Sequence, residues 1–343
     1  MFLDPSLSAS GKISCASCHD PRFAYGPPNS LPVQVAGKDL KQWGIRAVPS
    51  LRYLQAVPAF TEHSFDETNG DESLDNGPSG GLTWDGRVDR GREQARIPLL
   101  SPYEMANASP AAVVARARKA SYASAFHQLD AEQTFALILE ALEVWEQDPH
   151  EFYPYDSKYD AFLDGKTALT DQEQRGLKLF TDPAKGNCAR CHIATRGVNG
   201  TPPQFTDYGL IAIGVPRNPT IPANADANWH DMGMCGPLRT DLRGRPEYCG
   251  RYMTPTLRNV ALRQTFFHNG VFHSLKDVLE FYASRDSNPA KWYPQMAIFD
   301  DLPAEYGANI DRDPPFGRSP ALSAQEIDDV IAFLKTLTDG FRK

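Results

Sequence analysis

Cys15-Ala16-Ser17-Cys18-His19 is the stretch that decides the fold, and Cys188-Ala189-Arg190-Cys191-His192 repeats its pattern later in the chain. Each stretch places two thiols and an imidazole at positions i, i+3 and i+4, which lie on one face of a short helix. The thiols can then add to the two vinyl groups of a haem while the histidine binds the iron. One such motif could be a redox dithiol or half of a zinc site. Two motifs, each with a histidine directly after the second cysteine, predict two covalently bound c-type haems.

The remaining two cysteines are Cys235 and Cys249. In an oxidising compartment, two cysteines on either side of a short loop that contains glycine and proline most simply form a disulfide. Two buried thiols are the alternative that the sequence leaves open.

Length and charge limit the organisation and the partners of the chain. Its 343 residues are most naturally read as two domains. With 35 basic and 43 acidic residues, the formal net charge of -8 gives no basic footprint for nucleic acid. No apolar run approaches the roughly 20 residues that span a bilayer, so we expect no membrane span. The residues after Met1 do not form a signal peptide, and we expect a periplasmic protein whose signal peptide is absent from this sequence.

An internal repeat indicates two cytochrome units. Leu179-Phe180-Thr181-Asp182-Pro183 precedes the second motif, and Met1-Phe2-Leu3-Asp4-Pro5 precedes the first. In the second unit, Thr170 as N-cap and Glu173 as its capping-box partner predict a helix that continues through Phe180. The first unit has no room for this helix, so we expect the sequence to begin inside or just after it.

Apolar periodicity predicts further helices over residues 111–120, 131–145, 275–282 and 324–337. Strand-like alternation is scarce, and 28 prolines with 25 glycines predict long ordered loops around the haems. A turn at Gly165-Lys166 predicts a domain boundary. The sequence therefore predicts a mainly α fold with two cytochrome c-like haem domains, formed by residues 1–165 and 166–343.

The segment Leu82-Thr83-Trp84-Asp85-Gly86-Arg87 resembles the haem-bridging segment of the bacterial di-haem cytochrome c peroxidase and MauG family. The distal segments of that family resemble Glu93-Gln94-Ala95, Pro98 and Tyr103-Glu104-Met105 of this chain. The segment Phe267-His268-Asn269-Gly270 also resembles the family sequence. The resemblance covers nearly the whole chain. It implies that hydrogen peroxide reacts at the haem of the N-terminal domain, whose iron His19 binds, and that His192 binds the second iron.

The distal ligand of the second haem separates two chemistries in this family. In ordinary di-haem peroxidases a methionine follows the histidine of the Phe-His-x-Gly segment by fourteen residues, and the corresponding residue after His268 is Tyr282. The resemblance therefore implies a tyrosine ligand, as in MauG, which favours ferric and higher oxidation states. The alternative is that Tyr282 is only a core aromatic beside Leu279.

Three residues are implied for the distal side of the first haem, namely Gln94, Pro98 and Glu104. No histidine occurs between His19 and His63, so we expect this haem to be open without reductive activation. Glu104 would move a proton from the proximal to the distal peroxide oxygen, and Trp84 would lie between the haems as the electron bridge. Taken alone, Glu104 could be a solvated carboxylate and Trp84 a core residue.

Two departures from the family pattern limit what the resemblance implies. The calcium site of the family uses an asparagine side chain and two backbone carbonyls, but Tyr53 stands at the asparagine position and Arg263-Gln264-Thr265 replaces the Thr-x-Pro segment. The carbonyls remain while the side-chain oxygen is lost, which leaves calcium binding possible but disfavours it. Gly186 stands where MauG has a surface tryptophan, so the docking route of MauG does not transfer.

Other segments look like the MbnH-like relatives of MauG, which are encoded beside a small copper-binding partner protein. These segments include Ile213-Gly214-Val215-Pro216-Arg217 and Cys235-Gly236-Pro237-Leu238-Arg239. The resemblance implies a high-valent di-haem state that oxidises a tryptophan of such a co-encoded partner, with kynurenine as the product. A peroxide-scavenging cytochrome c peroxidase fed by a small carrier, and an electron-carrier cytochrome with both irons closed, are the alternatives.

Overall fold

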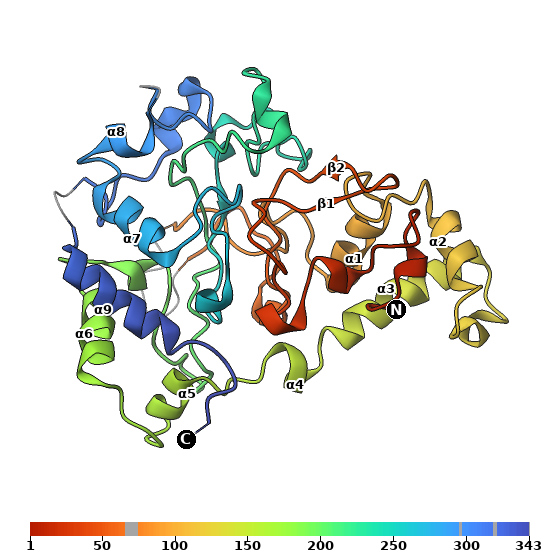
Figure 1. Cartoon of the computed structure of the whole chain (residues 1–343), viewed down its shortest axis with the longest axis horizontal. Helices are drawn as coiled ribbons and strands as arrows, with labels where there is room; N and C mark the ends of the chain where they lie inside the picture. Colours follow the sequence, from red (N-terminus) through yellow and green to blue (C-terminus); the bar gives the residue numbers. More distant parts are fainter. Residues whose placement is uncertain (66–74, 295–296, 318–320, 343) are drawn as a thin grey trace.

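The computed structural model describes residues 1–65, 75–294, 297–317 and 321–342. Two groups of helices lie at opposite ends of an elongated molecule, with long loops between them (Figure 1). The N-terminal group consists of α1 Gly91–Leu100, α2 Pro110–Ala117 and α3 Ala131–Trp145. The C-terminal group consists of α6 Asp171–Thr181, α7 Leu275–Ser284 and α9 Ala324–Lys335, and shorter helices are α4 Pro149–Phe152, α5 Lys158–Leu163 and α8 Pro289–Trp292.

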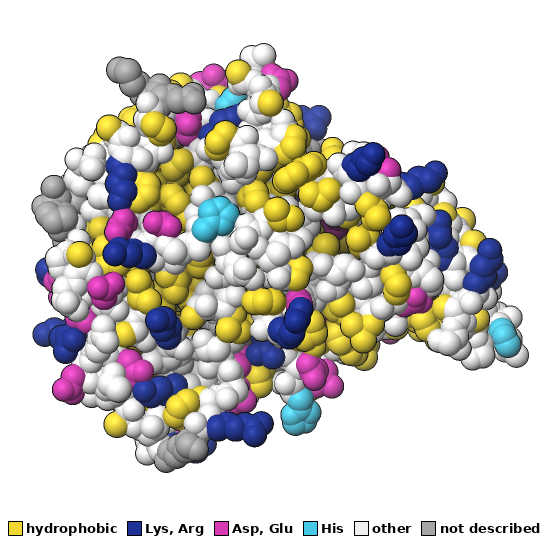
Figure 2. Space-filling view, in the orientation of Figure 1, with side chains coloured by type: hydrophobic (Ala, Val, Ile, Leu, Met, Phe, Trp, Pro, Cys, Tyr) yellow, Lys and Arg dark blue, Asp and Glu magenta, His cyan; other side chains and the backbone are white. Residues whose placement is uncertain are grey.

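Strands are minor elements in the described residues. Val35–Ala36 (β1) pairs antiparallel with Gln42–Trp43 (β2), and Leu210–Ile211 (β3) pairs antiparallel with Tyr252–Met253 (β4). The regular structure is therefore mainly α. No helix in the described ranges is both long enough and apolar enough to cross a membrane, and basic and acidic side chains are scattered over the face shown in Figure 2.

The predicted helices form, and their capping residues show why. Asp130 accepts a hydrogen bond from the Gln133 N–H and opens α3, which spans the predicted residues. Thr170 and Glu173 form the predicted capping box of α6. Helices α2, α7 and α9 differ from the predicted ranges by a few residues at their ends.

Helix α1 was not predicted from the sequence. It contains Pro98, which has no N–H to donate to the Gln94 carbonyl four residues earlier. The segment is also polar and lacks a long apolar stripe, so sequence periodicity gave no helical signal. Arg90 and Glu93 nevertheless form its N-terminal hydrogen bonds.

Two hydrophobic clusters form the cores of the two ends. The N-terminal cluster packs α1, α2 and α3 around buried side chains such as Leu99, Val113 and Ile138. The C-terminal cluster packs α6, α7 and α9, and α6 and α9 approach so closely that a Cβ on Gly176 would lie 2.0 Å from the Asp329 carbonyl oxygen.

The predicted domain boundary at residue 165 stays a prediction. Helix α5 lies before this boundary, but Tyr159 of α5 is buried in the C-terminal cluster. Its N–H also donates to the carbonyl of Thr336, at 3.0 Å. By its packing, α5 therefore goes with the C-terminal group of helices.

Candidate functional site

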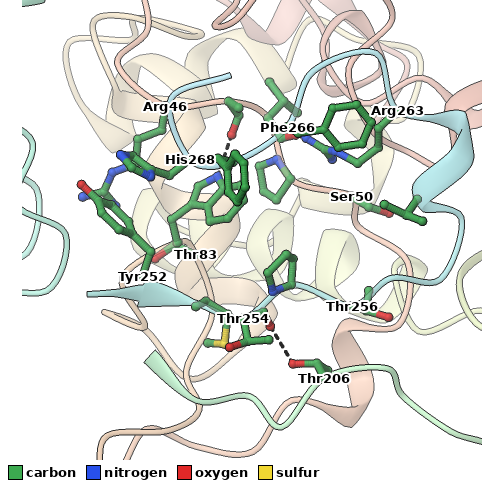
Figure 3. A pocket seen from close by; sticks show the side chains of 18 of the residues that line it. Arg46, Ser50, Thr83, Thr206, Tyr252, Thr254, Thr256, Arg263, Phe266 and His268 are labelled. Atoms are coloured by element: carbon green, nitrogen blue, oxygen red, sulfur yellow. Dashed lines mark hydrogen bonds between the residues drawn. The ribbon is translucent and has the colours of Figure 1, made fainter. Parts of the chain in front are cut away.

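One large cavity, of about 760 Å³, is lined by residues from both ends of the molecule. Both Cys-x-x-Cys-His motifs contribute to its wall. So do the residues for which the sequence predicted a role in the reaction or at the second iron, namely Trp84, Gln94, Pro98, Glu104 and Tyr282. The chain thus brings the predicted site residues to one cavity, part of whose wall is shown in Figure 3.

The two motifs adopt the same local structure. Cys15–Ser17 and Cys188–Arg190 are short 3-10 helices, and each following histidine donates its backbone N–H to the first cysteine carbonyl at 2.9 Å. None of the four motif cysteines forms a disulfide with a described residue, which leaves their thiols available for another bond. Burial raises the pKa of each of these thiols to about 12, so they are neutral groups in the cavity wall.

Both motif histidines are held in the orientation that an iron ligand needs. His19 Nδ1 lies 2.9 Å from the Tyr25 carbonyl oxygen, and His192 Nδ1 lies 2.9 Å from the Phe205 carbonyl oxygen. Because a carbonyl can only accept, Nδ1 carries the proton and Nε2 carries the lone pair. Burial also lowers the pKa of His19 to about 4, which keeps its imidazole neutral.

Unsatisfied polar atoms in the cavity wall provide a test of whether the site fits a haem. Arg52 Nε and Tyr208 OH are buried and find no hydrogen-bond acceptor among the described residues. Both residues line the cavity. Each haem carries two carboxylates that can accept such bonds, so the donors, the thiols and the histidines together fit two haems.

Glu104 is held by its backbone in the loop after α1. Its carbonyl accepts from the Gly37 N–H at 2.9 Å, and its own N–H donates to the Ser101 carbonyl at 3.1 Å. Burial raises the pKa of Glu104, against the opposing effects of the Ser101 side chain and the Arg87 charge. Glu104 is half-buried and lines the cavity, so its carboxyl group is able to exchange a proton there rather than being a fully solvated surface carboxylate.

Trp84 is fixed by both halves of the chain. Its indole Nε1–H donates to the Ala47 carbonyl at 2.7 Å, and its own carbonyl accepts from the Met253 N–H at 2.8 Å. The Ala47 N–H in turn donates to the His268 carbonyl at 2.6 Å. The indole therefore has one fixed position where the two halves meet.

Tyr282 lies on α7 and lines the cavity while it also contacts aromatic core residues. Its ring stacks on Phe316 with centroids 5.4 Å apart and an angle of 22°. Burial raises the pKa of its hydroxyl, and the thiols of Cys191 and Cys188 contribute to the shift. The phenol therefore lies in the same part of the cavity as the second motif.

The structure forms a disulfide between Cys235 and Cys249, whose Cα atoms are 4.9 Å apart. These cysteines are buried in a third, small hydrophobic cluster with Met234 and Tyr248.

At the position discussed for calcium, the Tyr53 hydroxyl donates to Asp339 at 2.6 Å. Among the described residues, no group of three or more His, Cys, Asp or Glu side chains is placed to hold a metal ion.

Sequence reasoning missed an ionic and aromatic cluster in the wall of this cavity. His268 Nε2 lies 3.0 Å from an Asp301 carboxylate oxygen, and the His268 ring stacks on Tyr252 with centroids 3.6 Å apart. Arg46 bridges Asp85 and Asp231 through bonds of 2.6–2.7 Å. No local sequence signal predicts these contacts, because the partners are far apart in the chain.

Comparisons with known proteins agree with this geometry. The family model described as di-haem cytochrome c peroxidase matches residues 1–168. The methylamine utilization protein MauG of Paracoccus denitrificans is 34% identical over 362 residues, covering 99% of this chain and 87% of that protein.

Two solved structures are also similar. The diheme peroxidase BthA from Burkholderia thailandensis superposes with a TM-score of 0.87 at 37% identity, covering 98% of this chain and 84% of BthA. A MauG-like protein associated with microbial copper homeostasis has a TM-score of 0.67 at 25% identity, covering 98% of this chain and 87% of that protein. The chain therefore belongs to the di-haem cytochrome c peroxidase and MauG family of haem oxidoreductases.

Proposed function

We propose that this protein is a di-haem oxidase that uses hydrogen peroxide to oxidise a tryptophan on a partner protein. With kynurenine as the product, each tryptophan consumes two molecules of hydrogen peroxide and releases one ring carbon as formate, with water as the other product. The observation that carries the proposal is the position of Tyr282, which lines the cavity near the second motif. A tyrosine at this iron favours higher oxidation states, whereas a methionine favours the reduced state of an electron-accepting haem. The second haem is therefore suited to hold oxidising equivalents.

The spacing of the two motifs supports covalent attachment of the haems. Cys15 and Cys18 would hold the first haem by thioether bonds, and Cys188 and Cys191 would hold the second. His19 and His192 would supply the lone pairs of their Nε2 atoms to the irons. When bound, the haems supply the peroxide and redox chemistry, and the protein supplies ligands, proton transfer and an enclosed site.

The residues that line the cavity support a first iron that would stay open to peroxide. The cavity histidines in the described residues are His19, His192 and His268, and His268 Nε2 already contacts Asp301. Gln94, Pro98 and Glu104 also line the cavity, and they lie outside the two Cys-x-x-Cys-His motifs. Glu104 would accept a proton from hydrogen peroxide and return it to the leaving oxygen, and the raised pKa that burial gives its carboxyl group suits it to exchange that proton.

The tryptophan of another folded protein would have to reach groups that lie inside this chain, so we take oxidation to occur at a distance. Trp84, fixed between the halves through Ala47 and Met253, would connect the two haems. The partner is a small, copper-binding, co-encoded protein in the periplasm. Support for this partner class comes from similarity to the MauG-like protein associated with microbial copper homeostasis.

A second candidate function is favoured by a specific finding, the 37% identity to a protein described as a diheme peroxidase. In that case the protein reduces hydrogen peroxide with electrons from a small carrier. The two functions differ in where the oxidising equivalents go, namely to a side chain of the partner or to a soluble reductant.

One experiment separates these functions. The holoprotein is mixed with peroxide and either the co-encoded partner or a small reduced cytochrome, and both the partner mass and cytochrome oxidation are followed. The oxidase proposal predicts a modified tryptophan in tryptic peptides of the partner and slow cytochrome oxidation. Rapid cytochrome turnover with an unchanged partner mass would establish the peroxidase instead, and Glu104→Gln serves as the matched variant that lowers either reaction.

A further inference from the structure

Six arginines line the cavity, and one of them differs from the others in its partners. Five form ion pairs with carboxylates: Arg46 with Asp85 and Asp231, Arg52 with Asp339, Arg87 with Asp85, Arg190 with Asp311 and Asp313, and Arg258 with Asp160. Arg263 forms no ion pair with any described residue.

The hydrogen bonds of Arg263 go only to backbone carbonyls in the described part of the chain. Its Nε donates to the Thr265 carbonyl at 3.2 Å, and its Nη2 donates to the Val48 carbonyl at 3.1 Å. These carbonyls hold the guanidinium in place but carry no net charge. Burial lowers the pKa of Arg263 to about 10, which still leaves the side chain charged at neutral pH.

A buried guanidinium without an anion is strongly unfavourable, because desolvation is not offset by a nearby opposite charge. The other cavity arginines show that this chain supplies carboxylates where it buries such charges. The missing anion at Arg263 therefore belongs to a group that enters the cavity from outside the polypeptide.

The surroundings of Arg263 indicate which anion this is. The residue follows the C-terminal haem motif in sequence but reaches the N-terminal half, where its Nη2 donates to the Val48 carbonyl. Its Nη1 lies 3.7 Å from where a Cβ on Gly26 would stand, and the carbonyl of the preceding residue, Tyr25, lies 2.9 Å from His19 Nδ1. Figure 3 shows it in the pocket wall, near Phe266. A haem bound through His19 carries carboxylates into this space.

We propose that Arg263 binds a carboxylate of the haem held by His19. The guanidinium then has its counter-ion, and the haem gains a charged anchor in addition to its thioether bonds and its histidine ligand. This inference concerns cofactor binding, so it holds for either reaction that the haems carry out.

The test uses the holoprotein and three variants. Arg263→Gln removes the charge and keeps a hydrogen-bond donor, and Arg263→Lys keeps the charge. Arg22→Gln is the control, since it removes a positive charge whose side chain is 81% exposed and solvent-screened. Denaturing mass spectrometry first establishes that both haems are attached in each variant.

Two readouts report on the carboxylate and do not depend on turnover. The resonance Raman band of propionate bending shifts when a carboxylate loses a hydrogen-bond donor, and the reduction potential of the first haem falls when a nearby positive charge is lost. We expect both changes in Arg263→Gln, neither in Arg22→Gln, and retention of the wild-type potential in Arg263→Lys.

Two results would overturn the inference. The first is an unchanged propionate band and potential in Arg263→Gln with both haems bound. The second is a potential in Arg263→Lys as low as that of Arg263→Gln, since the charge would then not be the cause. If Arg263→Gln cannot be obtained with both haems, the propionate band of Arg263→Lys is compared with that of the wild type. Lysine keeps the charge but changes the hydrogen-bond donor, so a shifted band supports the inference and an unchanged band overturns it.

Discussion

Replacing Glu104 by glutamine is the perturbation that most sharply tests the chemistry of the first haem site. Glutamine has nearly the same shape and keeps the backbone bonds to Gly37 and Ser101, so the loop after α1 should be preserved. What is lost is the carboxyl group that exchanges a proton with peroxide. Loss of a general acid-base group typically slows a reaction by about 10²–10⁴-fold, which corresponds to about 2.7–5.4 kcal/mol of activation free energy.

The pH dependence gives a second readout for the same variant. Glu104 has to be ionised to accept the peroxide proton, and burial raises its pKa above the ordinary glutamate value. The rate of the wild-type protein should therefore fall as the pH is lowered through this raised pKa. Glu104→Gln should lose that dependence, because it has no carboxylate to protonate.

Stopped-flow mixing of the ferric holoprotein with peroxide measures both effects. Glu146→Gln is the matched control, because Glu146 also lines the cavity and is half-buried like Glu104, and burial raises its pKa to about 8. The control should react within a few-fold of wild type. A wild-type rate in Glu104→Gln, or an equal loss in Glu146→Gln, would refute the assignment of the proton-transfer role to Glu104.

Three further predictions concern the haems, the helix packing and the metal. Denaturing mass spectrometry should find two haem masses on the wild-type chain, and Cys188→Ser with Cys191→Ser should retain one; a wild-type chain with fewer than two would contradict the attachment. Gly176→Ala should lower the free energy of unfolding by about 1–3 kcal/mol in a denaturant titration, because its Cβ would overlap the α9 backbone. Gly307→Ala, whose Cβ would meet no atom within 4 Å, is the control, and equal stability of the two variants would contradict the packing argument. Removing divalent cations with a chelator should leave the absorption spectrum of the holoprotein and its peroxide reaction unchanged, and a loss restored by calcium would contradict this.

The parts of the fold that could be predicted were those with a local sequence signal. Helix α3 has a clear apolar stripe and the N-cap Asp130, and its predicted range agrees with the structure. Helix α1 has Pro98 inside it and a polar composition, so nothing local distinguishes it from a loop. It forms because Ala95 and Leu99 are buried against the N-terminal cluster, which is a tertiary effect.

The candidate site divides in the same way. The motif cysteines and histidines are recognisable from spacing, because their chemistry needs a fixed separation along one helix face. Trp84, Glu104 and Tyr282 were proposed from the family resemblance, and the structure places all three along one cavity. The unpaired charge of Arg263 could not be predicted from the sequence. Whether an arginine has a carboxylate partner depends on which Asp and Glu side chains lie within ion-pair distance of it in the folded chain.

The electron paramagnetic resonance spectrum of Tyr282→Phe is the most direct measurement of the central claim, that a tyrosine at the second iron makes this site an oxidase. Phenylalanine keeps the ring that stacks on Phe316 and removes only the hydroxyl that can bind iron. The account predicts that the low-spin ferric signal of the second haem changes while the high-spin signal of the first haem is kept. A low-spin signal identical to that of the wild-type protein would contradict the account.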